Sequence, residues 1–178
     1  MITALELLKD ELKSAHDIFE QTASDIADEH VQLDPGGKAF PLGATYAHLV
    51  FSEDVILHGM IMGGKPPLYE TEFKDKTGAS SPMPPMDENW EAANHEWSKS
   101  VQIDMGKMRE YAKVVYAATD TYIDSLTEED LEKEIDLGSW GKKKLHEMLS
   151  GFIIAHTNQL TGELAALKGV HGVKGYPF

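Results

Sequence analysis

The stretch FIIAHTNQLTGELAALKG, residues 152–169, constrains the fold more than any other part of the sequence. Its apolar residues recur at helical spacing, and a closing glycine is a typical helix stop. We therefore predict a long last helix over about residues 142–168. One imidazole, that of His156, lies within its apolar face. One turn further on, the same face carries Leu160, where a second histidine would complete an i, i+4 pair suited to a metal ion.

Outward from this stretch, three more segments have the apolar periodicity of helices. The first reaches about residue 28, and its apolar stripe consists of Leu5, Leu8, Leu12, Ala15 and Phe19. The second begins near Pro41 and stops at 63–64, and its largely apolar circumference is typical of a central core helix. The third starts at the N-cap residue Asp87 and runs to about Leu126, with a break or kink at 98–100.

Four substantial helices with almost no strand predict an all-α fold, specifically a four-helix bundle. The connection between the second and third helices, residues 65–86, contains five of the eight prolines. A loop of this length is a functional lid or a mobile excursion, and we place it inside a single domain that covers residues 1–178. The segment LEKEIDLGSWGKK, residues 131–143, is predicted to be extended.

Composition excludes several functional classes. The net charge of −14 opposes contact with a nucleic-acid backbone, because such contact depends on lysine and arginine side chains that neutralise phosphates. The chain has no cysteine, which removes disulfides and thiolate ligands and fits a reducing compartment. The first residues do not resemble a signal peptide, and no apolar stretch is long enough to span a bilayer. We expect a cytoplasmic protein that binds neither nucleic acid nor membrane.

Seven of the eight histidines fall into two groups. Those with polar neighbours or near expected helix ends are predicted to be solvated surface residues; they are His16, His30, His95, His146 and His171. His48 and His156 instead lie in the middle of apolar helices, so each needs a hydrogen-bond partner or a metal. Residue type and position alone leave both possibilities open.

Neighbours of these two histidines can be placed by helical geometry. Ser52 shares the face of His48, whereas His58 points about 80° away and is a weaker ligand candidate. Glu163 shares the face of His156, with Gln159 adjacent to it. Glu163 lies about 10 Å along the axis from His156, so both could hardly bind one ion directly. His58, Gln159 and Glu163 are therefore possible substitute groups, or groups that orient an imidazole.

Two segments resemble the DinB/YfiT superfamily. In PLGATYAHLVFSEDVIL, Tyr46 precedes His48 by two positions, as an aromatic residue precedes a metal-binding histidine in that family's second helix. In HTNQLTGELAALKG, the first histidine of the family's last-helix pattern is His156 and its final glycine and polar residue are Gly162 and Glu163. The resemblance implies a four-helix bundle, often a homodimer, with three histidines that bind zinc or nickel. Characterised members of the family include transferases that use the thiols mycothiol or bacillithiol, which the metal would bind as thiolates.

The sequence departs from this pattern at Leu160, which occupies the third-ligand position. Catalytic zinc normally has three protein ligands, so the histidine site is predicted to be incomplete. One hypothesis is a divalent-metal-dependent transferase or hydrolase with His48 and His156 as ligands and the proline-rich loop as a cap. The alternative is a metal-free ligand-binding or dimeric stress-response scaffold. A third hypothesis, an adaptor for another protein, has no feature that identifies a partner. The sequence assigns no catalytic residue.

Overall fold

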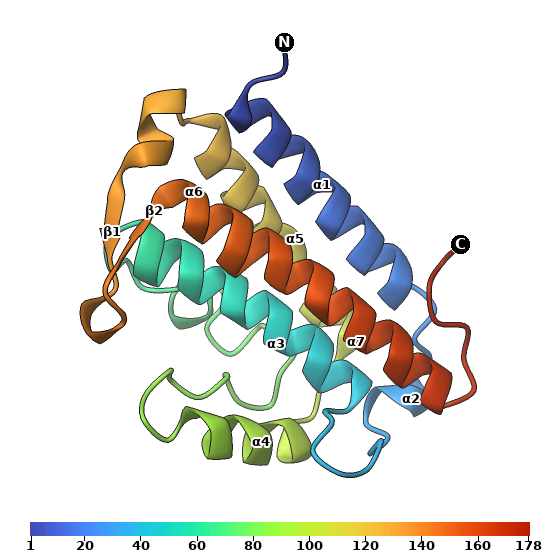
Figure 1. Ribbon diagram of the computed structural model, residues 1–178. Coiled ribbons are helices and arrows are strands. Elements are labelled where there is room, and N and C mark those ends of the chain that lie inside the picture. The colour runs from blue at the N-terminus through green and yellow to red at the C-terminus, as the bar shows by residue number, and fades with distance from the viewer.

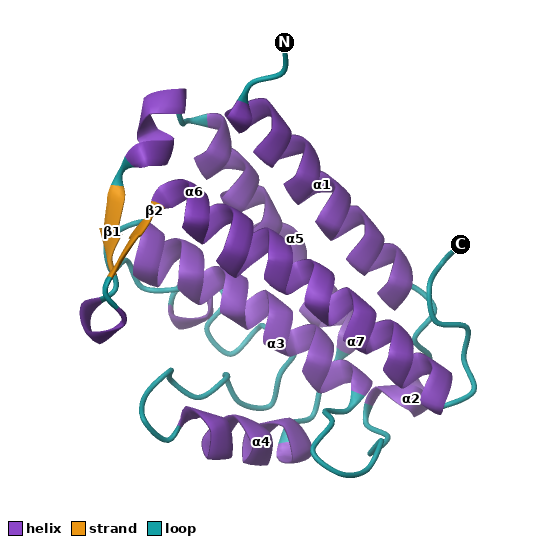
Figure 2. Ribbon diagram, viewed as in Figure 1, coloured by secondary structure: helices purple, strands orange, loops and turns teal.

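Helices α1, α3, α5 and α7 lie side by side and form the body of the protein (Figure 1). The computed structural model describes residues 1–178, apart from the side chain of Ser139. The α-helices are α1 (Ala4–Ala23), α2 (Asp28–Val31), α3 (Leu42–Asp54), α4 (Trp90–Ser100), α5 (Met105–Asp124), α6 (Leu145–Glu147) and α7 (His156–Val170). The two strands are β1 (Glu134–Asp136) and β2 (Lys142–Lys144), and Figure 2 shows how small this hairpin is beside the helices.

The first helix begins at a capping box. The Thr3 hydroxyl accepts a hydrogen bond from the Glu6 amide, and the Glu6 carboxylate accepts one from the Thr3 amide. The inner part of the predicted stripe is buried, whereas Leu5 and Leu8 pack only partly against the core. The helix ends at Ala23 rather than near residue 28, because the short helix α2 follows as a separate element.

The second and last helices each contain a π-helical segment. Helix α3 continues through the segment Val55–Ile61, and α7 is preceded by the segment Met148–Ala155. The predicted start of the last helix near residue 142 was wrong, because β2 pairs there with β1 in antiparallel register. Lys142 and Lys144 also form ion pairs with Glu134 and Glu132, so the lysine run favours the hairpin over an exposed helical turn.

The predicted third helix is two helices. Helix α4 starts at Trp90 rather than at Asp87 and lies beside α3, apart from the other long helices (Figure 1). The chain is extended at Val101, and Asp104 then caps α5 by accepting a hydrogen bond from the Lys107 amide. The expected break is therefore real, but it lies a few residues after 98–100.

Between the π-helical segment and α4, the chain is irregular except for a turn of 3-10 helix, Leu68–Glu70, and an isolated antiparallel bridge from Ala79 to Ile103. Residues of this loop take part in the core, since Met83 is buried and Leu68, Tyr69 and Phe73 pack against the buried cluster. Among the residues that the structure describes, none of the helices combines the length and the apolar character needed to cross a bilayer.

Candidate functional site around His48 and His156

The structure brings His48 and His156 together. His48 lies on α3 and His156 is the first residue of α7, and these two helices pack against each other. The imidazole centroids are 5.3 Å apart, and the ring planes are nearly perpendicular at 85°. Two candidate ligands that are separated by more than 100 residues of sequence thus face the same small region between two helices.

Both imidazoles are neutral near pH 7. Burial, together with the neighbouring His156 ring, lowers the pKa of His48 to about 4. Burial also lowers the pKa of His156, although the Glu53 carboxylate opposes that shift. Each ring therefore keeps one nitrogen lone pair that can accept a hydrogen bond or bind a metal.

The loop between α3 and α4 covers His48 with a sulfur atom. The Sδ atom of Met83 lies 3.3 Å from His48 Nδ1, and the Ser52 hydroxyl donates to the same sulfur at 3.8 Å. The rings of Phe40 and Trp90 each have centroids 6.0 Å from that of His48. These two aromatic residues also line an open cavity of about 620 Å³.

The third-ligand position is apolar. Leu160 is buried within the main hydrophobic cluster, and only 7% of its surface is exposed. Gln159 and Glu163 are exposed on α7. His58 lies elsewhere, with its Nδ1 atom 2.8 Å from the Asp54 carboxylate. Over the described residues, no group of three histidine, aspartate or glutamate side chains is arranged to hold a metal ion. A three-ligand zinc or nickel centre therefore does not fit this site.

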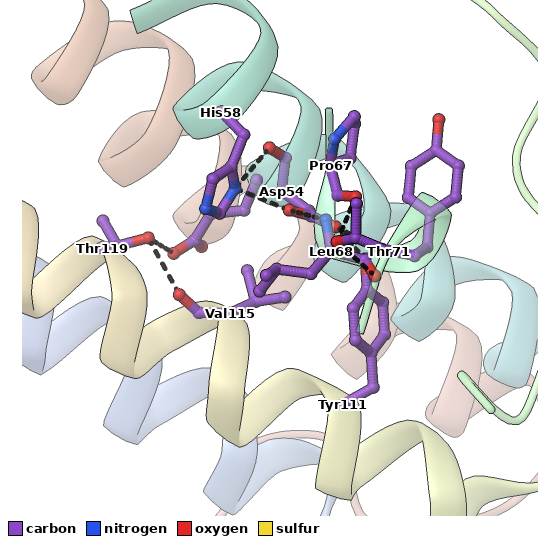
Figure 3. A network of polar contacts seen from close by, with 10 residues as sticks. Asp54, His58, Pro67, Leu68, Thr71, Tyr111, Val115 and Thr119 are labelled. Atoms are coloured by element: carbon purple, nitrogen blue, oxygen red, sulfur yellow. Dashed lines mark hydrogen bonds and ion pairs between the residues drawn. The ribbon is translucent and has the colours of Figure 1, made fainter. Parts of the chain in front are cut away.

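The buried carboxylate of Asp54 anchors the loop between α3 and α4, the covering loop, to α3 through hydrogen bonds. Asp54 is fully buried and accepts hydrogen bonds from the amides of Leu68 at 3.0 Å and Tyr69 at 3.2 Å. The Tyr111 hydroxyl donates to it at 2.5 Å, and burial, reinforced by this carboxylate, raises the pKa of Tyr111. Figure 3 shows Tyr111 of α5 and Leu68 at the start of the loop on either side of Asp54.

Glu53, the preceding residue, organises a second buried network. Its carboxylate lies 2.9 Å from His16 Nε2 and accepts a hydrogen bond from the Thr119 hydroxyl at 2.6 Å. The ring of Tyr116 stacks on His16 with centroids 4.0 Å apart. Burial alone would lower the pKa of His16, but Glu53 outweighs it and the pKa is raised.

The surface assignment of His16 was wrong, since only 6% of it is exposed. It follows Leu12 by four residues and therefore belongs to the buried face of α1, a signal that the helical spacing contained. The other four histidines of that group are partly buried. His30 and His171 even lie near each other, with ring centroids 6.4 Å apart.

Comparisons with known proteins agree with the sequence resemblance. The model of the DinB superfamily matches residues 11–163. A crystal structure described as a conserved protein of a locus from Enterococcus faecalis is similar, with a TM-score of 0.76 and 19% sequence identity. The similarity covers 96% of this chain and 98% of that one, and at this identity it concerns the fold alone. No curated protein matches the sequence.

Proposed function

Because this chain belongs to the DinB superfamily, we propose that it is a four-helix bundle that binds a small molecule at the His48–His156 pair without a three-ligand zinc or nickel centre. One contrast carries the proposal. The two imidazoles lie 5.3 Å apart with their pKa values lowered, whereas position 160 contributes a buried leucine to the core. The pair is polar, whereas the third-ligand position is apolar.

The chemistry of the pair favours binding over catalysis. A zinc or nickel ion in a complete site would stabilise a bound thiol as its thiolate. A free thiol has a pKa near 8.5, whereas His48 titrates at about 4, so His48 is a poor base for a thiol. The neutral imidazoles are instead well suited to exchange hydrogen bonds with a thiol, hydroxyl or carbonyl group of a ligand. Such a ligand would replace the contact between His48 and Met83.

A second candidate function is a divalent-metal-dependent thiol transferase, in which His48 and His156 hold the ion. The proximity of the two rings favours it, and the missing third ligand opposes it. We also infer a homodimer and a cytoplasmic location. The family resemblance supports the dimer, and the absence of cysteine supports a reducing compartment. Light scattering on a size-exclusion column would test the dimer.

The test uses untagged protein and two kinds of probe. Elemental analysis and equilibrium dialysis with Zn²⁺ and Ni²⁺ should give less than stoichiometric uptake at pH 7. Bacillithiol and mycothiol, added without metal, should shift the imidazole NMR signals of His48 and His156, and His48→Asn should remove the effect. Stoichiometric zinc that is lost in His48→Asn would overturn the proposal in favour of the transferase. Thiols that leave both rings unperturbed would remove the support for a thiol ligand.

A further inference from the structure

A second cavity lies between α1 and α5. Its volume is about 420 Å³, and it is open to solvent. Its most buried lining residues are Leu12, His16, Tyr116 and Ile123. His16 contacts Glu53, which follows His48 by five positions on α3 and therefore points about 140° away from it. The cavity thus belongs to another side of α3 than the His48 ring.

The imidazole of His16 has one nitrogen bound to the protein and one without a protein partner. Its Nε2 atom lies 2.9 Å from the Glu53 carboxylate, and only 6% of the residue is exposed. Over the residues with described side chains, Nδ1 has no hydrogen-bond partner, and it is not sealed off from solvent. Because His16 lines the cavity, this nitrogen belongs to a buried polar side chain that a ligand can reach.

Two carboxylates beside His16 lack a basic partner. The lysines of the cavity are already paired with other carboxylates, Lys9 with Asp124 at 2.8 Å and Lys13 with Asp17 at 2.5 Å. In the part of the chain with described side chains, no lysine or arginine forms an ion pair with Glu20 or Asp120. Burial lowers the pKa of the imidazole, and Asp120 and Glu20 act with Glu53 to raise it. Both carboxylates therefore act on the ring of His16.

The two carboxylates suit a cation. The hydroxyls of Tyr46 and Tyr116 both donate to Oε1 of Glu20, at 2.7 and 3.1 Å, so the Oε2 atom stays available. Burial raises the pKa of Asp120, which means that the charged form of this carboxyl gains from a neighbouring cation.

The lining of the cavity selects an ammonium ion with an apolar body. An ammonium group donates three hydrogen bonds, which matches two carboxylates and one neutral imidazole nitrogen. Leu12 and Ile123 supply apolar surface for the rest of the molecule. A phosphate or a carboxylate would instead meet the charges of Asp120 and Glu20. The volume lies within the range of about 300–1,000 Å³ that is usual for small-molecule sites.

We propose that the cavity between α1 and α5 binds a small organic ammonium ion, held by Asp120, Glu20 and the Nδ1 atom of His16. This site goes beyond the proposed function and uses neither His48 nor His156. The bound ammonium and a protonated His16 oppose each other, because both are cations beside the same carboxylates. The affinity should therefore rise as the pH is raised through the pKa of His16, which lies above 6.5, while an alkylammonium with a pKa of about 10 stays charged.

The test is isothermal titration of the untagged, full-length protein with phenethylamine. Its neutral counterpart, phenethyl alcohol, measures the part of the affinity that is apolar. Asp120→Asn removes one carboxylate at an exposed position, so the fold should survive it. Glu110→Gln, also exposed on α5 but outside the cavity, is the matched control for the lost charge. Imidazole NMR signals report which histidine senses the amine.

The native protein and Glu110→Gln should bind one phenethylamine per chain, about ten-fold more tightly than phenethyl alcohol, and the signals of His16 should shift. Asp120→Asn should bind the amine about five-fold more weakly. No uptake of the amine, equal affinity for the alcohol, unchanged affinity in Asp120→Asn, or shifts at His48 in place of His16 would each overturn the proposal. The thiol experiment reads His48 and His156, so its outcome is independent of this one.

Discussion

Leu160→His should convert this bundle into a zinc-binding protein. Residues 156 and 160 both lie in the regular α-helix α7, so the new imidazole would stand one turn from His156 on the same face. His48 already faces His156 across the helix interface. The substitution would therefore supply the third nitrogen ligand that the present site lacks.

The loss of stability expected for Leu160→His follows from the burial of Leu160. Only 7% of its surface is exposed, so exchanging the leucine for a polar ring should cost about 2 kcal/mol without metal. In a domain of this size that loss lowers the melting temperature by about 4–8 °C. Free zinc at 100 times its dissociation constant returns about 2.7 kcal/mol, enough to offset the loss.

The assay is thermal unfolding with and without zinc, combined with equilibrium dialysis. Leu160→Ala is the matched control, since it loses about 2–5 kcal/mol of packing and adds no ligand. Leu160→His should recover its melting temperature in zinc, and the control should not. Adding His48→Asn to Leu160→His should abolish the recovery. A zinc-dependent recovery that survives His48→Asn, or no recovery at all, would refute the geometry inferred for the pair.

Three further predictions concern the buried polar groups. Glu53→Gln should lower the free energy of unfolding in urea by about 3–5 kcal/mol, because it leaves the buried His16 without its charged partner; a change under 1 kcal/mol would contradict this reading. The pKa of His48 falls from 6.5 to about 4 on folding, so the neutral ring stabilises the protein above pH 6.5. That contribution, about 3 kcal/mol, should disappear as the pH falls from 6.5 to 4, and His48→Asn should flatten this part of the stability profile. Asp54→Asn should cost about 2–3 kcal/mol and speed hydrogen exchange at the Leu68 amide; protection equal to that of the native protein would show that the loop does not depend on Asp54.

Helical periodicity predicted the main helices and the two histidines that meet. His48 and His156 lie within long apolar runs, and burying those runs against each other brings the two rings together. The polarity of the residues next to a histidine in the sequence was a poorer guide to whether that histidine is buried. His16 has charged neighbours in sequence but shares a helix face with Leu12, and that face is buried.

The covering loop could not be predicted because it has no periodicity. Nothing in a proline-rich segment indicates that Met83 packs on His48, since that contact depends on how the loop crosses α3. The sequence gives only a weak indication that Asp54 anchors the loop: it is a carboxylate in the middle of a largely apolar helix. A buried charge of that kind must accept several hydrogen bonds, and a loop with free amides can supply them.

The π-helical segments make the direction of His156 a matter of residue count. A π-helical turn behaves as a helix with one residue inserted, and each residue turns a helix by about 100°. The segment Met148–Ala155 ends immediately before His156, and it contacts the π-helical segment that follows α3. Gly151 lies within it, exposed and with open space where a side chain would project. Deleting that single glycine would let the segment relax into an ordinary α-helix and leave His156 directed toward α3, because the π-helical turn already holds one residue more than an α-helical turn. In this fold a one-residue deletion within the segment is therefore absorbed, whereas a second one would turn His156 by about 100° from its present direction.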